Sequence, residues 1–299
     1  MPRVSTIMSV YNSERFLKKA VDSILSQTFR DFEFIIVNDG SSDSSLSILE
    51  KYAEQDSRIL LINQENIGLT KSLNKAIELA NGDLIARMDA DDISLPERFA
   101  QQVAYLDSYP DCVAVGCEVM QIDMDGDPIC QMNIPLSHEK IEALLLKGNG
   151  GAIRHPAVML RGETLITIGK YREKFQTAQD LDLFLRLAQR GRLANLSNTL
   201  LNYRLHLDSI NFAKYSIQTQ NIIAVLKEAY RDRSLDDTIK FPSWRFKNYQ
   251  PWEHHRTWTN MALRAGNVNT ARKHAFLVLS QKPVSRHSWK LVFETLKIF

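Results

Sequence analysis

The feature that most constrains the fold is the alternation of strand-like and helix-like segments between residues 4 and 92. Short apolar runs are separated by stretches whose apolar residues recur at helical spacing. Strands separated by helices predict a mostly parallel sheet covered by helices on both faces, and therefore an α/β fold. The expected strands are residues 4–10, 32–37, 59–62 and 83–88, and the expected helices are residues 16–25, 44–53 and 70–80.

The pattern loosens after residue 100, although individual elements can still be assigned. A mostly helical region is expected from residue 216 onward. The expected helices before it are residues 96–106, 141–146 and 181–188, and the expected strands are residues 112–120 and 155–160.

A polar cluster follows each of the first four expected strands at its carboxyl end. In α/β sheets, ligands bind at the carboxyl ends of the strands. We therefore expect these clusters to converge on one edge of the sheet, although long stretches of sequence separate them. The clusters are Tyr11-Asn12, Asn38-Asp39-Gly40, Asn66 and Asp89-Ala90-Asp91-Asp92.

The acidic cluster after the fourth strand is a candidate metal site. Three carboxylates within four residues repel one another unless a cation or hydrogen bonds intervene. Hard divalent cations are bound by one or two carboxylates together with substrate phosphates, so the cluster could hold a metal–diphosphate. A solvated loop in which Asp92 caps the next helix remains the alternative.

Two further carboxylates each allow two interpretations. Asp39 lies in a run of turn-forming residues, but a carboxylate at a strand end can also accept a hydrogen bond from a nucleotide base. Asp180 could cap the helix that follows it or act as a general base. His155 and His206, taken singly, are more often structural than functional residues.

The order of these segments is more specific than any one of them. Taken together they resemble the family-2 glycosyltransferases of bacterial polysaccharide and lipopolysaccharide assembly. The resemblance covers roughly residues 3–210 and does not include the C-terminal region. The segments that carry it are residues 4–12, 23–28, 32–41, 66–69, 87–92, 96–99, 155–159, 179–183 and 203–206.

This resemblance implies a GT-A fold, in which a Rossmann-like sheet is followed by an acceptor-binding half. It also implies a nucleotide-sugar donor. Asp39 would accept from the base N–H, which favours a UDP-sugar. The residues that would bind the donor are Val10, Tyr11, Asn12, Glu14, Asp39, Asn66, Lys71, Asp89 and Ala90.

The resemblance further implies a metal-assisted, inverting transfer. Asp91 would bind Mn²⁺ or Mg²⁺, and His206 matches a position that often adds a histidine to the metal or diphosphate. Asp180 matches the catalytic base, while His155 and Gln179 would lie on the side of the glycan or lipid-linked acceptor. The family usually has Glu where this chain has Gln179, which could change acceptor choice or lower the rate.

Three other functions fit the sequence less well. A catalytically impaired protein that only binds a nucleotide-sugar is supported by Gln179 alone. A sugar-nucleotide pyrophosphorylase would need a glycine-rich, basic loop after the first strand, where this chain has Tyr11 and Asn12. A dinucleotide oxidoreductase would need Gly-x-Gly-x-x-Gly at that place, and the motif is absent.

The C-terminal region differs in charge from the rest of the chain. Residues 240–299 contain 11 Lys and Arg against 2 Asp and Glu, together with all four tryptophans, although the formal net charge of the whole chain is only +2. We therefore divide the chain into a catalytic domain, residues 1–215, and a helical basic region, residues 216–299. That region could be a helical cap with a solvated basic face, a contact for an anionic membrane or, least favoured, a nucleic-acid surface.

Hydropathy and cysteine content predict a cytoplasmic protein, which could lie at the inner face of the cytoplasmic membrane. No run reaches the roughly 18 apolar residues of a spanning helix. The N-terminus opens directly into an expected strand and lacks the pattern of a secretory signal. Cys112, Cys117 and Cys130 lack metal-site spacing and are expected to be reduced and packed as small apolar residues.

Overall fold

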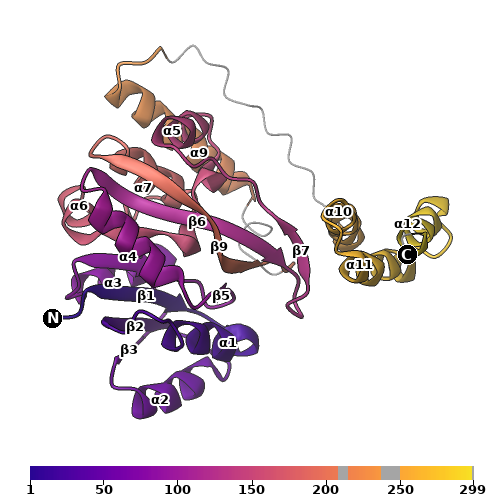
Figure 1. The fold of residues 1–299 in the computed structure, drawn as a ribbon, viewed down its shortest axis with the longest axis horizontal. Helices are drawn as coiled ribbons and strands as arrows, with labels where there is room; N and C mark the ends of the chain where they lie inside the picture. The colour runs from indigo at the N-terminus through magenta and orange to yellow at the C-terminus, as the bar shows by residue number, and fades with distance from the viewer. Residues whose placement is uncertain (208–214, 237–249, 298–299) are drawn as a thin grey trace. The chain divides into compact units, whose positions relative to one another are not determined.

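The structure, a computed structural model, describes residues 1–207, 215–236 and 250–297. The N-terminal part alternates strands and helices as the sequence predicts (Figure 1). Helices α1 and α2 lie side by side on one side of the first strands, and α3 lies on the other. The elements are β1 (Val4–Val10), α1 (Glu14–Leu25), β2 (Phe32–Asp39), α2 (Ser45–Gln55), β3 (Ile59–Gln64), α3 (Leu69–Glu78) and β4 (Leu84–Arg87).

These four strands form the parallel part of the sheet. Strand β1 lies between β2 and β4, and Val4 is paired with both Phe32 and Leu84. On the next strand pair, Asp39 at the end of β2 is opposite Gln64 at the end of β3. Because the strands run in the same direction and in register, the polar loops that follow them emerge at one edge, as expected.

Further strands extend this sheet beyond β4. The strand order is β3-β2-β1-β4-β8-β6-β9-β5, and β7 pairs with β6 outside that path. Strand β8 is antiparallel to both β4 and β6. The added strands are β5 (Ile93–Ser94), β6 (Cys112–Ile122), β7 (Pro128–Gln131), β8 (Met159–Arg161) and β9 (Arg192–Arg204).

The strand expected at residues 155–160 is wrong in its first half. Residues His155–Ala157 form a 3₁₀ turn, and β8 begins only at Met159. Pro156 explains the difference, because its ring fixes φ and removes a backbone N–H that a strand ladder would use. The turn leaves the His155 ring buried next to Tyr171.

Contacts between residues divide the chain into two compact units. Unit 1 comprises residues 1–118, 134–201 and 216–242, and unit 2 comprises residues 119–133, 202–215 and 243–299. The division of the chain at residue 215 remains a prediction, because these units follow packing instead of sequence order. Helix α9 (Tyr215–Asp232), for example, places Val225, Leu226 and Tyr230 in the core of unit 1.

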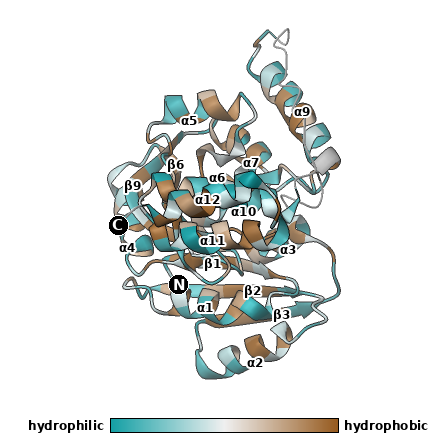
Figure 2. Ribbon diagram, turned by 90° about the vertical axis from the view of Figure 1, so that its right-hand side faces the viewer, coloured by the Kyte–Doolittle hydropathy of each residue, from teal (hydrophilic) through white to brown (hydrophobic). Residues whose placement is uncertain are grey.

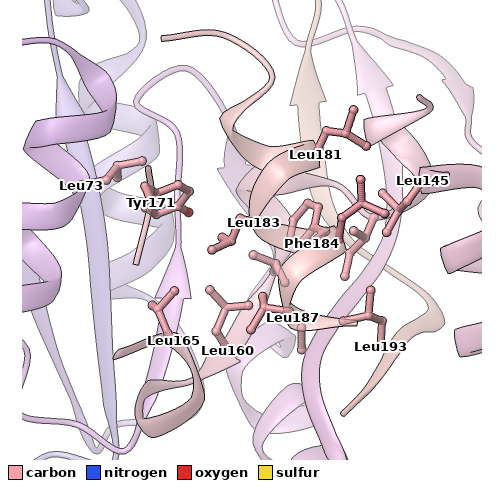
Figure 3. Packing of buried hydrophobic residues seen from close by; sticks show 14 of the residues in the cluster. Leu73, Leu145, Leu160, Leu165, Tyr171, Leu181, Leu183, Phe184, Leu187 and Leu193 are labelled. Atoms are coloured by element: carbon pink, nitrogen blue, oxygen red, sulfur yellow. The ribbon is translucent and has the colours of Figure 1, made fainter. Parts of the chain in front are cut away.

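The core of unit 1 joins the sheet to the helices that follow β5 (Figure 3). Leu73 of α3, Leu160 of β8 and the apolar side chains of α7 belong to one buried cluster. This packing fixes the N-terminus of α7, where Asp180 lies. The helices are α4 (Arg98–Ser108), α5 (His138–Leu145), α6 (Gly162–Thr167) and α7 (Gln179–Leu187).

Unit 2 is mostly helical, as the sequence predicts for its C-terminal part. Trp258 packs with Ile129, Ala262 and Ala271 in one small core, while a second core joins the last two helices. Its helices are α10 (Pro251–Arg264), α11 (Val268–Gln281) and α12 (Arg286–Leu296). In Figure 2, β1 and β2 are mostly hydrophobic, whereas α11 carries both hydrophobic and hydrophilic residues. Among the described helices, none has the length and hydropathy needed to span a bilayer.

Candidate functional site

Two loops at the carboxyl edge of the parallel strands hold each other through hydrogen bonds. Asn12, whose backbone is left-handed with φ 48°, accepts from the Ser42 N–H at 2.8 Å through Oδ1. Glu14 and Asp43 form a reciprocal link: the Glu14 N–H donates to Asp43, and the Ser44 N–H donates to Glu14. Asn12 and Glu14 therefore shape the loops after β1 and β2. Val10 is buried below them and Tyr11 is 54% exposed.

Asp39 is buried at the end of β2, where it organises the loop before α3. Its two oxygens accept the backbone N–H groups of Ile67 and Gly68, each at 2.9 Å, and the Gln64 amide at 3.0 Å. The neighbouring Gly40 has φ +73°, and a Cβ there would lie 2.6 Å from the Asn66 backbone nitrogen. Asp39 and Asn66 thus meet at one place, as expected. The side chains of Asn66 and Lys71 are exposed.

The acidic cluster forms the loop directly after β4. Asp89, Asp91 and Asp92 each offer a carboxylate oxygen, and the three oxygens lie within 4.8 Å of one another. Asp89 and Asp91 are half-buried, whereas Ala90 and Asp92 are buried. The set consists of hard oxygen donors on one short loop, so it fits a divalent cation that is also bound by phosphates.

Arg87, the last residue of β4, forms an ion pair with Asp89. Its guanidinium is fully buried, in contrast to most arginines in folded proteins. Burial raises the pKa of Asp89, as do the charges of Asp91 and Asp180, whereas Arg87 opposes that rise. Because the charge of Asp180 contributes to the raised pKa of Asp89, the two carboxylates lie within electrostatic reach of each other.

Asp180 lies in the first turn of α7. The helix follows Ala178, which has a left-handed backbone with φ 59° and ψ 18°, an uncommon conformation for a residue with a Cβ. Asp180 Oδ1 accepts the Leu181 N–H at 2.8 Å. Gly150 lies beside the other oxygen, since a Cβ on Gly150 would be 3.5 Å from Asp180 Oδ2, an ordinary van der Waals distance. Burial raises the pKa of the Asp180 carboxyl, and Arg87 and Arg154 oppose the rise.

His155 is buried against Tyr171, with Nε2 2.6 Å from the tyrosine oxygen. Burial, together with the Arg87 charge, holds the pKa of His155 well below its usual value. Burial also raises the pKa of Tyr171, with smaller contributions from Asp180 and Asp89 in the same direction. The imidazole is therefore neutral at pH 7, and its ring lies edge-on to the rings of Tyr171 and Phe184. Gln179 is half-buried beside Asp180.

Three residues support this arrangement without having been assigned roles from the sequence. Arg87 pairs with Asp89. Arg98 is fully buried and donates to the backbone oxygens of Arg87 and Pro156, which joins the end of β4 to the turn at His155. Tyr171 is held through its backbone by Asn74 of α3 and faces His155. A charged residue within an apolar strand was the only sequence signal for Arg87.

His206 is the one proposed metal ligand outside unit 1. It is buried just after β9, in the segment that belongs to unit 2. Its assignment to the metal therefore stays a prediction. Every other predicted site residue belongs to unit 1. Most of them lie at the carboxyl ends of β1 to β4 or in the loops and helix starts that follow these strands. Gln179 and Asp180 begin α7, and His155 lies in the 3₁₀ turn before β8.

Solved structures with similar folds include two glycosyltransferases. One is S. aureus TarS 1-349 in complex with UDP-GlcNAc, with a TM-score of 0.59, 19% identity and coverage of 98% of this chain and 89% of that one. The other is the mannosyltransferase PcManGT from Pyrobaculum calidifontis in complex with GDP-Man and Mn²⁺, with a TM-score of 0.59, 17% identity and coverage of 99% and 84%. These similarities confirm the expected GT-A fold.

Sequence comparison identifies the family directly. The O-antigen biosynthesis glycosyltransferase WbnJ of Escherichia coli is 35% identical over 207 residues, which make up 68% of this chain and 80% of WbnJ. Residues 5–164 match the family described as Glycosyl transferase family 2, and that match spans β1 through α6 with the whole acidic loop. The chain is therefore a transferase that belongs to glycosyl transferase family 2.

Proposed function

We propose that the chain transfers a sugar, with inversion, from a UDP-sugar to a hydroxyl of a glycan or lipid-linked acceptor. The observation that carries the proposal is the placement of the Asp89–Asp92 loop and Asp180 in one unit, within electrostatic reach of each other. The O-antigen role in the name of WbnJ supports a place in bacterial polysaccharide or lipopolysaccharide assembly.

Asp180 is the base in this proposal. The acceptor oxygen bonds to the anomeric carbon, its proton passes to an Asp180 oxygen, and the bond from the anomeric carbon to the diphosphate oxygen breaks. Oδ2 is the better placed oxygen, since Oδ1 already accepts from the Leu181 N–H. A raised pKa makes the carboxylate a stronger proton acceptor once it is ionised.

The donor is held by the loops after β1, β2, β3 and β4. Val10, Tyr11, Asn12 and Glu14 form the first wall, and the exposed Asn66 and Lys71 form another. Asp39 retains acceptor capacity for a base N–H, because a carboxylate offers about four lone-pair sites and three hydrogen bonds reach it here. Asp89 and Ala90 complete the pocket. The TarS complex supports UDP as the nucleotide, although PcManGT binds GDP-Man.

A divalent cation, Mn²⁺ or Mg²⁺, is the proposed cofactor. Asp91 would hold it, with Asp92 or Asp89 nearby, and His206 would be a further ligand. When bound, the ion would act as a Lewis acid that stabilises the charge of the leaving diphosphate. The Mn²⁺ in the PcManGT complex supports this assignment.

Gln179 supports one second candidate, a nucleotide-sugar-binding protein with impaired catalysis. An amide at this position cannot accept a proton or carry the negative charge that the usual Glu provides. Gln179 and His155 lie on the proposed acceptor side, so the substitution bears on acceptor positioning. The proposed location is the cytoplasm, at the inner face of the membrane where a lipid-linked acceptor would be available.

The experiment that tests the proposal measures donor binding and donor hydrolysis with a panel of UDP-, GDP- and dTDP-sugars. Each donor is assayed with Mn²⁺, with Mg²⁺ and with a chelator, on the wild type, Asp180→Asn and Gln179→Glu. We expect metal-dependent turnover of one UDP-sugar, which Asp180→Asn reduces by roughly 10²- to 10⁴-fold while binding persists. Gln179→Glu is the matched control, because it keeps the base and restores the usual neighbour.

The outcomes separate the candidates. Donor binding without turnover in the wild type, with turnover gained in Gln179→Glu, would identify an impaired enzyme. Turnover of a GDP-sugar alone would overturn the uridine assignment to Asp39. Absence of binding to every sugar nucleotide would overturn the proposal as a whole.

A further inference from the structure

The outward face of α12 exposes large apolar side chains that the fold of unit 2 does not bury. Leu291 and Val292 point into the small core shared with α11. On the other side of the helix, Trp289 is 48% exposed, Phe293 57% and Leu296 42%. Their spacing of four and three residues places them on one stripe of the helix.

This stripe is held in place. The Trp289 indole N–H donates to the Pro283 carbonyl at 2.8 Å, so the polar edge of the ring is satisfied by the turn before α12. The rings of Trp289 and Phe293 lie 6.4 Å apart. In the same turn, Val284 is 97% exposed. The rings of Trp289 and Phe293 are thus exposed. The indole N–H of Trp289 already has an acceptor, so it needs none from a binding partner.

Basic side chains flank the apolar stripe. Arg286, Lys290 and Lys297 are all exposed, and at 100° per residue they fall on the outward side of α12 next to Phe293. Glu294 is the acidic residue of this helix, and it pairs with Lys290 at 3.7 Å. The surroundings are also cationic, since residues 240–299 carry 11 basic and 2 acidic residues.

We propose that the outward face of α12, defined by Trp289, Phe293 and Leu296 with Arg286, Lys290 and Lys297, docks on an anionic membrane surface. Aromatic and aliphatic side chains beside lysine and arginine suit a helix that lies in the interface of an anionic bilayer. Pairing with a second copy would bring like charges together, which disfavours that occupant. The inference rests on the proposed function in one respect: a lipid-linked acceptor would be met at that surface.

The test is sedimentation of the full chain with phosphatidylcholine vesicles that contain or lack phosphatidylglycerol, at low and at high salt. We expect binding to the anionic vesicles, weakened by salt because each Lys or Arg near such a surface contributes through screened attraction. Binding that is equal on both kinds of vesicle, or absent on both, would overturn the proposal.

Two variants separate the apolar and basic contributions. Trp289→Ser/Phe293→Ser removes exposed rings, and Arg286→Glu/Lys290→Glu reverses two exposed charges. Each should lower the apparent partition coefficient by roughly tenfold or more. The matched controls are Ile166→Ser, whose side chain is 63% exposed in unit 1, and Lys51→Glu/Lys140→Glu. Controls that lose as much binding as the α12 variants would show that the contact is not on α12.

A third measurement locates the contact on α12. Brominated phosphatidylcholine quenches tryptophan that enters the bilayer, and we expect most of this quenching to disappear in Trp289→Phe while sedimentation persists. Unchanged quenching would overturn the proposal, as would an α12 variant that turns a dimer into a monomer. Donor hydrolysis without vesicles is measured in parallel. A loss of docking with hydrolysis intact leaves the proposed function standing, and the reverse result leaves docking standing.

Discussion

Two groups of three aspartates, one in each unit, differ in the cation that accompanies them. Asp89, Asp91 and Asp92 form the first group, and Asp123, Asp125 and Asp127 form the second; in each, the three carboxylate oxygens lie within 4.8 Å. In the second group, Lys273 Nζ lies 2.7 Å from Asp123, 2.5 Å from Asp125 and 2.8 Å from Asp127. In the first group, Arg87 pairs with Asp89.

The spacing of three aspartates does not by itself assign a metal site. The ammonium of Lys273 occupies the place between three carboxylates where a cation would be bound, and it ties α11 to the turn between β6 and β7. Asp123 Oδ1 also accepts the backbone N–H groups of Asp125, Gly126 and Asp127, so that loop is closed by its own hydrogen bonds. The second group is therefore best explained as a structural ion-pair cluster.

The largest expected effect comes from removing one carboxylate from each group. Asp91→Ala should lower metal-dependent donor turnover by roughly 10²- to 10⁴-fold, the range of several kcal/mol expected for loss of a metal's charge stabilisation. Asp125→Ala, the matched control in unit 2, should leave turnover within about twofold. Initial rates at saturating donor and metal measure both. An equal loss of donor turnover in the two variants would contradict the assignment of the metal to the first group alone.

Removing the cation from each group should cost stability. Arg87→Met breaks a buried ion pair and should lower the free energy of unfolding by about 3 kcal/mol. Lys273 is 31% exposed, so Lys273→Met should cost about 1–2 kcal/mol. Chemical denaturation measures both.

Lys273→Met also tests whether the ammonium occupies a place that a metal ion could take. Without the ammonium, the aspartates around it should gain a thermal stabilisation by Ca²⁺ that exceeds any response of the wild type. A Ca²⁺ response that is the same in Lys273→Met and in the wild type would show that Lys273 does not stand in for a cation.

Acidification should weaken unit 2 through a histidine near the second group. The His255 ring stacks on His274, with the two Nδ1 atoms 3.0 Å apart, and His274 lies 3.3 Å from Asp123. Burial and the neighbouring histidines lower the pKa of His255 to about 4. Between pH 6.5 and 4 the unfolded chain binds a proton that the folded chain does not. The free energy of unfolding therefore decreases as the pH is lowered through this window.

The size of this effect is about 3–4 kcal/mol at most, because each tenfold loss of proton affinity in the folded chain corresponds to about 1.4 kcal/mol. The contribution is complete above pH 6.5. His155 in unit 1 acts in the same direction, since its pKa is also lowered by burial. His255→Phe should therefore remove only part of the slope of unfolding free energy against pH, and an unchanged slope would contradict the assignment. Burial would raise the pKa of Asp123, but hydrogen bonds from His274 and Lys273 hold that pKa well below its usual value, so Asp123 contributes at lower pH.

The smallest expected effect concerns the backbone before Asp180. Ala178 has φ 59°, so Ala178→Gly should relieve strain and stabilise the fold by up to about 1 kcal/mol, offset in part by the entropy of glycine. The N-terminus of α7 should also become less rigidly placed, with a modest decrease in turnover. Thermal unfolding and initial rates measure the two changes, and a destabilised variant would show that Ala178 is not strained.

The parallel part of the fold and the loops of the candidate site could be predicted from the sequence. Strands β1 to β4 are apolar runs bounded by turn residues, and their order along the chain places Asp39 and Asp91 at one edge. Family membership and the GT-A fold were also predicted correctly. These features depend on local periodicity and on motifs with fixed spacing.

Other features depend on contacts between distant residues, which local patterns do not encode. Strand β8 has three residues and owes its existence to pairing with β4 and β6. The contact of Lys273 with Asp123 joins residues 150 positions apart. Arg87 is buried in a strand that is otherwise apolar, and its ion pair with Asp89 offsets part of the cost of burying the charge.

The interleaving of the two units has a practical consequence for cutting the chain. An engineered product that stops at residue 215 would lose α9 and, with it, a share of the core of unit 1. It would also expose Ile129 of β7, because Trp258, which packs against Ile129, would be missing. A better chimaera exchanges all three segments of unit 2 together, residues 119–133, 202–215 and 243–299, so that β7 and the helices that bury it come from the same protein.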